Sequence, residues 1–260
     1  AGVAAVMHTA SPFPISEPKD EADLIRPAVE GTARVLNAAA DAGVGRIVLT
    51  SSVVAIADLR RKRVQTAEDW ADPEAPGASA YGKSKTLAER EAWAIAGARG
   101  LALTTVNPAF VLGPPLDAQF GSSVGVIRRF LAGKDPAMPR VGFPVVDVRD
   151  VAALHLRALQ RPETAGRRLV AAAGSLWFAE MGRILKDAYP DRRIPTREAP
   201  KLLLQVLALF DPQVRALIPR LGILEEVSGE ATARDLDFTF TPPADALRAT
   251  AAWLVENGQA

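Results

Sequence analysis

The sequence predicts an α/β protein built on a doubly wound parallel sheet, with a smaller α/β domain attached. Three observations support this fold class. Short apolar segments alternate with helix-length segments in the order β-α-β-α-β along the first part of the chain. Polar residues follow each apolar segment, as they do where buried strands end in loops. The 260 residues, 48% hydrophobic and 23% charged, are enough for a sizeable core.

The first strand and helix are expected between residues 3 and 43. The apolar segment 3–7 predicts a buried strand, and the polar residues after it predict a loop. Residues 20–42 repeat apolar side chains at intervals of three and four, which predicts an amphipathic helix with Pro27 in its first turn. Gly43 then ends the helix, because glycine readily adopts the left-handed conformation of a helix C-terminus.

Two further strands enclose a second helix. The segments 46–50 and 101–106 are apolar and rich in β-branched residues, which predicts buried strands. Between them, residues 81–98 are rich in alanine, lysine and glutamate and predict a helix that Gly100 closes. The first of these strands ends at Ser51-Ser52 and the second at Asn107-Pro108.

Beyond residue 116 the pattern changes. Helices are expected at 122–132, 150–159 and 244–257, strands at 145–148 and 167–172, and a helix capped by Ser175 that runs to 189. The strand and helix at 145–159 suggest a return to the first domain. We therefore expect a first domain of residues 1–115 and 143–164, and a smaller second domain of residues 116–142 and 165–260, which the family resemblance described below implies to bind substrate.

Composition excludes several classes of protein. Cysteine is absent, so no disulfide or catalytic thiol exists, and we expect a cytoplasmic protein. The two histidines, His8 and His155, lie far apart and predict no metal site, and His155 suits a packing role. The longest apolar run, 202–210, is too short to span a membrane and suggests a buried or groove-lining helix. With a net charge of +1 and only the basic run 60–63, expected in a solvated loop, no nucleic-acid partner is implied.

Candidate catalytic residues lie at the expected strand ends, where doubly wound sheets bind ligands. Tyr81 and Lys85 are one helical turn apart and follow the strand that ends at Ser52. The spacing alone is a generic helix feature, and its position in the fold gives it weight. Asp147 and Asp150, which are three positions apart, could form a carboxylate pair, but we expect Asp150 to cap a helix instead.

This set of side chains suits carbonyl reduction. A carbonyl that accepts a hydride must also receive a proton, and Tyr81 can supply it if its pKa of about 10 is lowered. Lys85 would lower that pKa by about 1–3 units through its charge. Ser52 can donate a hydrogen bond to the carbonyl oxygen as negative charge develops there.

The motifs together resemble the extended short-chain dehydrogenase/reductases, the NAD-dependent epimerase/dehydratase superfamily. Within it, the chain is similar to the dihydroflavonol reductase and cinnamoyl-CoA reductase group and its bacterial aldehyde-reductase relatives. The residues that carry the resemblance are 8–12, 25–32, 46–52, Tyr81-Gly82-Lys83-Ser84-Lys85, Asn107-Pro108 and Gly113-Pro114. The resemblance covers residues 3–160 well and implies a Rossmann-like domain.

The resemblance also implies site residues and a cofactor. Ser52, Tyr81 and Lys85 would be catalytic, and the cofactor NADP(H) or NAD(H) would contact Thr9, Ala10, Ser11, Tyr81, Lys85, Pro108 and Val111. The family's glycine-rich phosphate loop is not found upstream of Val3, so we expect a chain truncated at its N-terminus that lacks the first β-α-β unit. Ala57 stands where plant flavonoid reductases carry Asn or Asp, which argues against a flavonoid substrate.

The leading hypothesis is an oxidoreductase that reduces an aldehyde or ketone with NAD(P)H, acting as a monomer or homodimer without nucleic-acid or membrane partners. Two alternatives remain open at this point. A sugar-nucleotide epimerase or dehydratase would share the same triad and fold. A non-catalytic dinucleotide-binding protein would bind cofactor without turnover.

Overall fold

The computed structural model describes residues 2–12, 18 and 20–260. The chain divides into two compact units, which are described separately. The first unit comprises Ala1–Ala109, Val151–Ala171 and Val227–Phe238. The second unit comprises Phe110–Asp150, Ala172–Glu226 and Thr239–Ala260.

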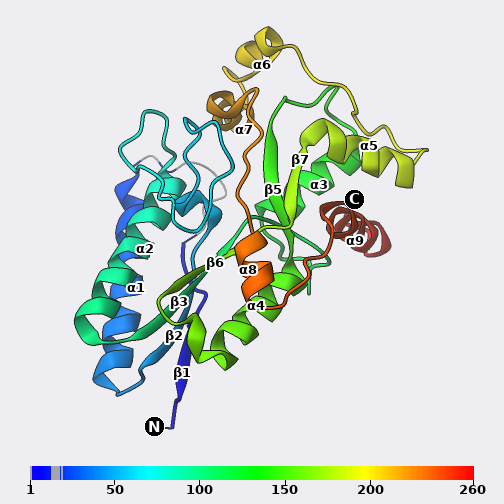
Figure 1. Cartoon of the computed structure of the whole chain (residues 1–260). Helices are drawn as coiled ribbons and strands as arrows, with labels where there is room; N and C mark the ends of the chain where they lie inside the picture. Colours follow the sequence, from blue (N-terminus) through cyan, green and yellow to red (C-terminus); the bar gives the residue numbers. More distant parts are fainter. Residues whose placement is uncertain (1, 13–17, 19) are drawn as a thin grey trace. The chain divides into compact units, whose positions relative to one another are not determined.

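A parallel four-stranded sheet forms the centre of the first unit. Its order is β1-β2-β3-β6, with β1 at Ala5–His8, β2 at Arg46–Thr50, β3 at Ala102–Pro108 and β6 at Arg167–Ala171. β2 and β3 are almost wholly buried, as expected for strands covered on both faces. Figure 1 shows the helices α1 (Ala22–Asp41) and α2 (Ala80–Arg99) on one side of the sheet. On the other side lie α8 (Glu230–Asp235) and residues 151–160 of α4 (Val148–Gln160).

The helices α1 (Ala22–Asp41) and α2 (Ala80–Arg99) pack against each other along their length. Ser79 caps α2, because its Oγ accepts a hydrogen bond from the backbone N–H of Gly82 at 3.1 Å. Gly100 ends α2 in the left-handed conformation, with φ of 66°, which confirms the expected stop. Pro27 does not lie in the first turn of α1 as expected, because the helix already begins at Ala22 and includes it.

The core of the first unit lies between the helix pair and the sheet. It joins apolar side chains of α1, α2 and the first three strands, among them Leu36, Ile47, Ala92 and Leu103. These side chains are almost fully removed from water. Burial of this kind is the main favourable contribution to folding, so the positions of the strand ends are fixed by the core behind them.

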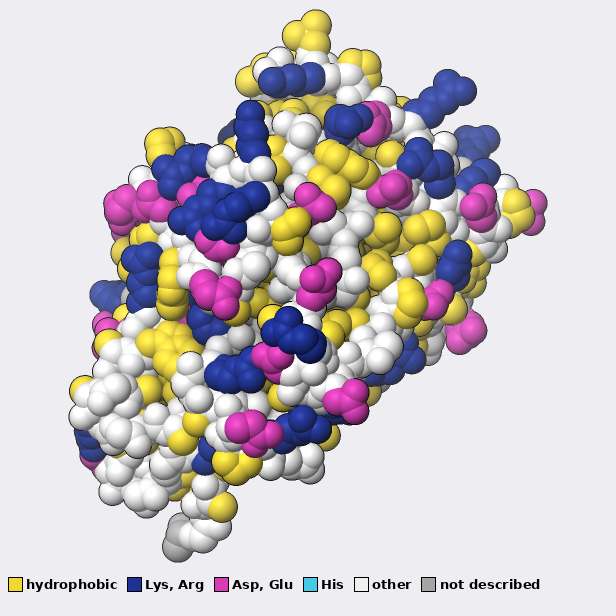
Figure 2. Space-filling model, viewed as in Figure 1, with side chains coloured by type: hydrophobic (Ala, Val, Ile, Leu, Met, Phe, Trp, Pro, Cys, Tyr) yellow, Lys and Arg dark blue, Asp and Glu magenta, His cyan; other side chains and the backbone are white. Residues whose placement is uncertain are grey.

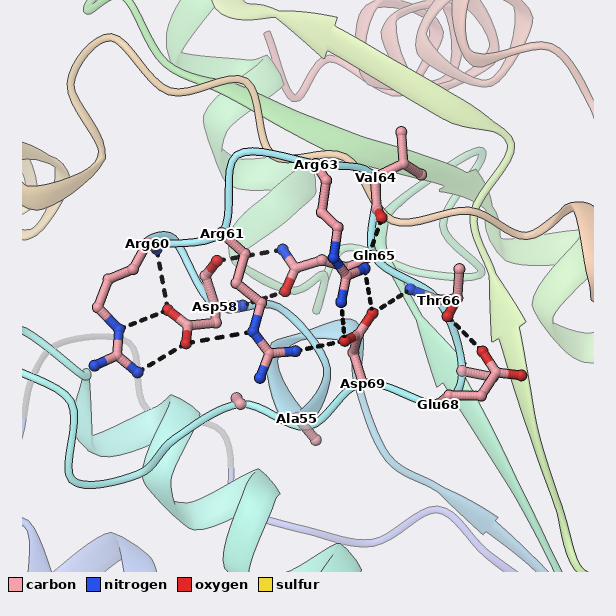
Figure 3. Close-up of polar contacts among 12 residues, drawn as sticks. Ala55, Asp58, Arg60, Arg61, Arg63, Val64, Gln65, Thr66, Glu68 and Asp69 are labelled. Atoms are coloured by element: carbon pink, nitrogen blue, oxygen red, sulfur yellow. Dashed lines mark hydrogen bonds and ion pairs between the residues drawn. The ribbon is translucent and has the colours of Figure 1, made fainter.

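The basic run 60–63 lies in the loop between β2 and α2 and is more than a solvated segment. Figure 3 shows Arg60 paired with Asp58, and Arg61 and Arg63 paired with Asp69. Both carboxylates are buried. The hydrogen bond from Arg63, above all, lowers the pKa of Asp69 to about 2. These arginines are exposed, like Lys62, as expected for a solvated loop, but they also neutralise the buried carboxylates and order the loop.

The second unit has a three-stranded sheet of order β4-β5-β7. β4 spans Phe110–Leu112, β5 spans Gly142–Asp147 and β7 spans Gly174–Trp177. β4 and β5 are parallel, whereas β5 and β7 are antiparallel. An apolar core joins this sheet to three helices: α3 (Ser122–Ala132), α5 (Phe178–Ala188) and α9 (Pro243–Glu256).

The remaining helices are α4, with 13 residues, and several shorter segments. They comprise α4 (Val148–Gln160), α6 (Lys201–Leu207), α7 (Pro212–Leu217), α8 (Glu230–Asp235) and three 3-10 turns at Val53–Ala55, Pro162–Thr164 and Ile218–Arg220. On the face drawn in Figure 2, basic and acidic side chains are interspersed. Among the described residues, no helix is both long and apolar enough to cross a membrane.

The two units divide the chain differently from the expected domains. β6 was expected in the second domain, but it pairs with β3 and extends the first sheet. β5 was expected in the first domain, but it pairs with β4 and β7. Strand pairing, which the local sequence pattern does not contain, decides both assignments.

Three local expectations about the second unit are wrong. Ser175 lies within β7 and donates a hydrogen bond to the carbonyl of Glu225 at 2.8 Å, so it does not cap α5; Trp177 is the N-cap. Asp150 accepts a hydrogen bond from the backbone N–H of Thr241 at 2.7 Å, so it does not cap α4 either. The run 202–210, which includes most of α6, is mostly exposed, and only Leu204 and Ala208 in it are buried.

Candidate active site

The strand ends of the first unit bring its polar residues to one edge of the sheet. His8 ends β1 and pairs in register with Leu49, two residues before Ser51. Thr50 pairs with Val106, one residue before Asn107. Because neighbouring parallel strands end at the same edge, the three polar segments meet there, as the sequence predicts.

Ser52 lies immediately after β2 in extended backbone, with φ of −163° and ψ of 156°. Its Oγ accepts a hydrogen bond from the backbone N–H of Val54 at 3.3 Å and approaches the carbonyl oxygen of Pro108 at 3.5 Å. The side chain is therefore held at the start of a 3-10 turn, between the ends of β2 and β3. Its hydroxyl is the donor in the longer contact with the Pro108 carbonyl.

Tyr81 and Lys85 project from the first two turns of α2. The Nζ of Lys85 lies 5.9 Å from the centre of the Tyr81 ring. A hydrogen bond joins the side chains of Tyr81 and Ser52. The structure therefore brings together all three residues that the sequence singled out for catalysis.

Burial opposes ionisation of both Tyr81 and Lys85. It raises the pKa of Tyr81 above 10, and the hydrogen bond with Ser52 offsets part of that rise. Burial also lowers the pKa of Lys85 to about 8, against the opposing charge of Glu89. The pKa of Tyr81 is therefore raised and not lowered as expected from its position beside Lys85, because burial removes water from around the phenol.

His8 belongs to the same cluster. Its side chain is buried, and its Nε2 has no hydrogen-bond partner among the residues that the structure describes. Burial and then the charge of Lys85 lower the pKa of His8, so the imidazole is neutral at physiological pH. A buried ring nitrogen without a protein partner suits a site that a ligand completes.

A buried carboxylate, Glu89, lies one turn beyond Lys85 and was missed from the sequence. It forms an ion pair with Arg168, with Nε and Oε1 2.6 Å apart. Its other oxygen accepts hydrogen bonds from Ser51 and, at 2.7 Å, from Asn107. The signal that could have found it is the spacing of Tyr81, Lys85 and Glu89 at intervals of four, which places an acid on the catalytic face of the helix.

His155 has the packing role expected for it. Its Nε2 lies 2.7 Å from the hydroxyl of Thr50, and its Nδ1 lies 2.8 Å from the carbonyl of Val151. The ring joins α4 to the end of β2 within the first unit. No cluster of potential metal ligands occurs among residues 2–12, 18 and 20–260.

The residues expected to hold a dinucleotide are placed as follows. Thr9, Ala10 and Ser11 follow the end of β1, with Thr9 and Ala10 exposed. Pro108 is buried at the end of β3. Val111 lies in β4 of the second unit, and its carbonyl accepts a hydrogen bond from Ser123 at 2.6 Å.

The residues at the strand ends fit the nicotinamide end of such a cofactor. The unpartnered Nε2 of His8 and the buried ammonium of Lys85 supply polar groups at the edge where the strands end. The described residues contain no glycine-rich loop that leads into a helix and could bind a pyrophosphate. Gly43 and Gly45 do not form one, because they lead into β2.

Comparisons with known proteins find similar reductases. Over 203 residues the chain is 36% identical to cinnamoyl-CoA reductase CAD2 of Medicago truncatula, covering 75% of this chain and 62% of that protein. Over 198 residues it is 34% identical to tetraketide alpha-pyrone reductase 2 of Arabidopsis thaliana, covering 73% of this chain and 61% of that protein. The chain thus spans about six tenths of the length of these curated relatives.

A solved structure shows the same fold. Yeast methylglyoxal/isovaleraldehyde reductase Gre2, complexed with NADPH, superposes with a TM-score of 0.79 at 28% identity, covering 99% of this chain and 78% of that one. Residues 1–172 match the family model described as NAD dependent epimerase/dehydratase. With the strand-end cluster in place on the parallel sheet, the chain belongs to the NAD dependent epimerase/dehydratase family.

Proposed function

We propose that this chain is part of an NADPH-dependent reductase that converts an aldehyde or ketone to an alcohol. The observation that carries the proposal is the cluster in which Ser52 is hydrogen-bonded to Tyr81 while Lys85 lies beside the Tyr81 ring. The reductase relatives and the NADPH complex of yeast Gre2 support both the reaction and the choice of cofactor.

Each side chain has a separate task in this reaction. The Ser52 hydroxyl donates a hydrogen bond to the substrate's carbonyl oxygen and stabilises the negative charge that develops there. Tyr81 gives its phenolic proton to that oxygen, which completes the alcohol. Lys85 stabilises the resulting phenolate and binds ribose hydroxyls. A reduced nicotinamide, when bound, supplies the hydride that the carbonyl carbon receives.

Residues at the same edge of the sheet support the proposed position of the cofactor. His8, neutral and with an unpartnered Nε2, lies at the end of β1, where Thr9, Ala10 and Ser11 would line the cofactor. Pro108, at the end of β3, would contact the nicotinamide. The contact of Val111 with the cofactor is a further part of the proposal, carried by the resemblance alone. We assign substrate binding chiefly to the second unit.

The proposal is tested by Tyr81→Phe, which removes the proton donor and keeps the ring. We expect kcat/KM with NADPH on a panel of aldehydes and ketones to fall about 10²–10⁴-fold. Tyr189→Phe is the matched control, because it changes the other tyrosine of the chain, in the second unit, and should leave turnover unchanged. Reduction by Tyr81→Phe at the parent rate would refute the proposal.

Location and assembly are further parts of the proposal. A chain of 260 residues without cysteine suits a reducing compartment, and we propose a cytoplasmic enzyme. We also propose a monomer or homodimer, which light scattering on the purified protein distinguishes from larger assemblies.

A further inference from the structure

The helix α2 carries three functional groups along one face, four residues apart: the phenol of Tyr81, the ammonium of Lys85 and the carboxylate of Glu89. The first two belong to the proposed reaction. Glu89 is only 1% exposed, although a buried charge is costly unless other groups compensate it. Its role is therefore a question that the reaction alone leaves open.

The surroundings of Glu89 are built to hold a negative charge. Besides Arg168, its carboxylate accepts hydrogen bonds from Ser51, Asn107 at 2.7 Å, Trp93 at 3.2 Å and Thr105 at 3.3 Å. These donors come from α2 itself, from β3 and from the segment after β2. Hydrogen bonds to a charged group are the stronger kind, so together they compensate part of the cost of burying the carboxylate.

Arg168 is fixed as firmly as Glu89. Its side chain is 8% exposed, and its guanidinium lies 3.9 Å from the centre of the Trp70 ring. It also donates hydrogen bonds to the carbonyls of Ala67, at 2.7 Å, and Asp69, in the loop that Figure 3 shows. The guanidinium is therefore held between Glu89, the loop carbonyls and the Trp70 ring.

The same network reaches the catalytic residues. Asn107, which binds Glu89, also donates a hydrogen bond to the backbone carbonyl of Ser52 at 3.1 Å. Three ionisable groups face Lys85: His8 from β1, and Tyr81 and Glu89 from α2. His8 is neutral and Tyr81 is protonated, so Glu89 is the anion among them.

We propose that Glu89 is a positioning residue that keeps Lys85 protonated for the reduction, with Arg168 as the counterion that makes its burial tolerable. The inference rests on the proposed function, because it assigns Glu89 a role toward Lys85 in that reaction. A purely structural ion pair would hold the sheet to the loop and leave the proton on Lys85 unaffected.

The test is Glu89→Gln, which removes the charge and keeps the shape. The pKa of Lys85, about 8 in the parent protein, should fall by about 1 unit, as expected when a nearby opposite charge is lost. Titration of the Lys85 side chain by NMR, with Lys85→Arg to assign the signal, measures this without turnover. The alkaline limit of kcat/KM should shift downward by the same amount.

Two further variants complete the experiment. Glu91→Gln is the control, because Glu91 lies on the same helix outside this network and should leave the Lys85 titration unchanged. If Glu89→Gln does not fold, the double variant Glu89→Gln/Arg168→Met removes both buried charges together. Compared with Arg168→Met, it isolates the charge of Glu89 and should show a lower pKa of Lys85. A Lys85 titration unchanged in the folded variant overturns the inference.

The outcome is separable from that of the proposed function. A normal reductase with an unchanged Lys85 titration in Glu89→Gln would refute the role of Glu89 alone. A protein whose Tyr81→Phe variant reduces carbonyls at the parent rate would refute the reaction, whatever the titration of Lys85 shows. A parallel shift of the titration and of the alkaline limit supports both.

Discussion

Replacing Arg168 by Met should destabilise the protein strongly, because Glu89 would stay buried without its counterion. Glu89 is 1% exposed and the Arg168 side chain 8%, so water cannot replace the lost partner. Breaking such a pair typically costs about 3–5 kcal/mol. The lost contact between Arg168 and the Trp70 ring adds about 0.5–2 kcal/mol, while Ser51 and Asn107 offset part of the cost by still donating to Glu89.

The expected net loss of about 3–5 kcal/mol is large against total stabilities of about 5–15 kcal/mol. Urea denaturation followed by tryptophan fluorescence measures it, and Trp70 is itself a probe of the site. The exposed pair Arg34–Glu30, with side chains 75% and 47% exposed, offers the control: Arg34→Met should change stability little.

The double variant Glu89→Gln/Arg168→Met distinguishes a lost charge partner from lost packing. With both charges removed, no ion is left buried alone, so the double variant should be clearly more stable than Arg168→Met. A cost of less than about 1 kcal/mol for Arg168→Met, or a double variant no more stable than the single one, would show that burial of Glu89 is not limiting.

Two more predictions concern the elements around the site. Ser79→Ala removes the side chain that accepts a hydrogen bond from the N–H of Gly82, so it should lower the free energy of unfolding by about 0.5–2 kcal/mol. Ser79→Asn keeps a capping side chain and should restore most of the loss. Equal denaturation midpoints for all three proteins would refute the role of the cap. Burial lowers the pKa of His155, so the unfolded chain binds a proton at this residue more readily than the folded protein does. The contribution of neutral His155 to the free energy of unfolding is therefore complete above the unfolded pKa of 6.5 and is lost as the pH falls below it. His155→Gln should therefore lose stability less steeply than the parent between about pH 6.5 and 5, and equal slopes of urea midpoint against pH would contradict this.

The catalytic cluster could be predicted because each of its parts depends on local sequence or on simple topology. Tyr81 and Lys85 share a helix face at a spacing of four. Ser52 follows a strand whose apolar pattern is unambiguous, and parallel strands end at one edge of the sheet. The structure needed to add only the distances and the order β1-β2-β3.

What could not be predicted depends on pairing between distant segments. Arg168 lies 79 residues from Glu89, and no local pattern links β6 to α2. β6 and β5 were assigned to the opposite domains for the same reason, because strand partners decide membership. The exposure of 202–210 is a further case, since an apolar run shows that burial would be favourable but not whether a partner surface exists.

Burial shifts the pKa values of Tyr81 and Lys85 in opposite directions, and this contrast explains the proposed role of Glu89. Loss of water raises the pKa of Tyr81 and lowers that of Lys85 to about 8, so both groups are pushed toward their neutral forms. A tyrosine that must give up its proton needs a cation beside it, and burial favours the neutral form of Lys85, whose pKa is about 8 with Glu89 in place. A buried carboxylate one turn further along the helix opposes the loss of that charge, and an arginine from the next strand compensates the cost of burying that carboxylate. The reactive pair therefore depends on a second, unreactive pair behind it.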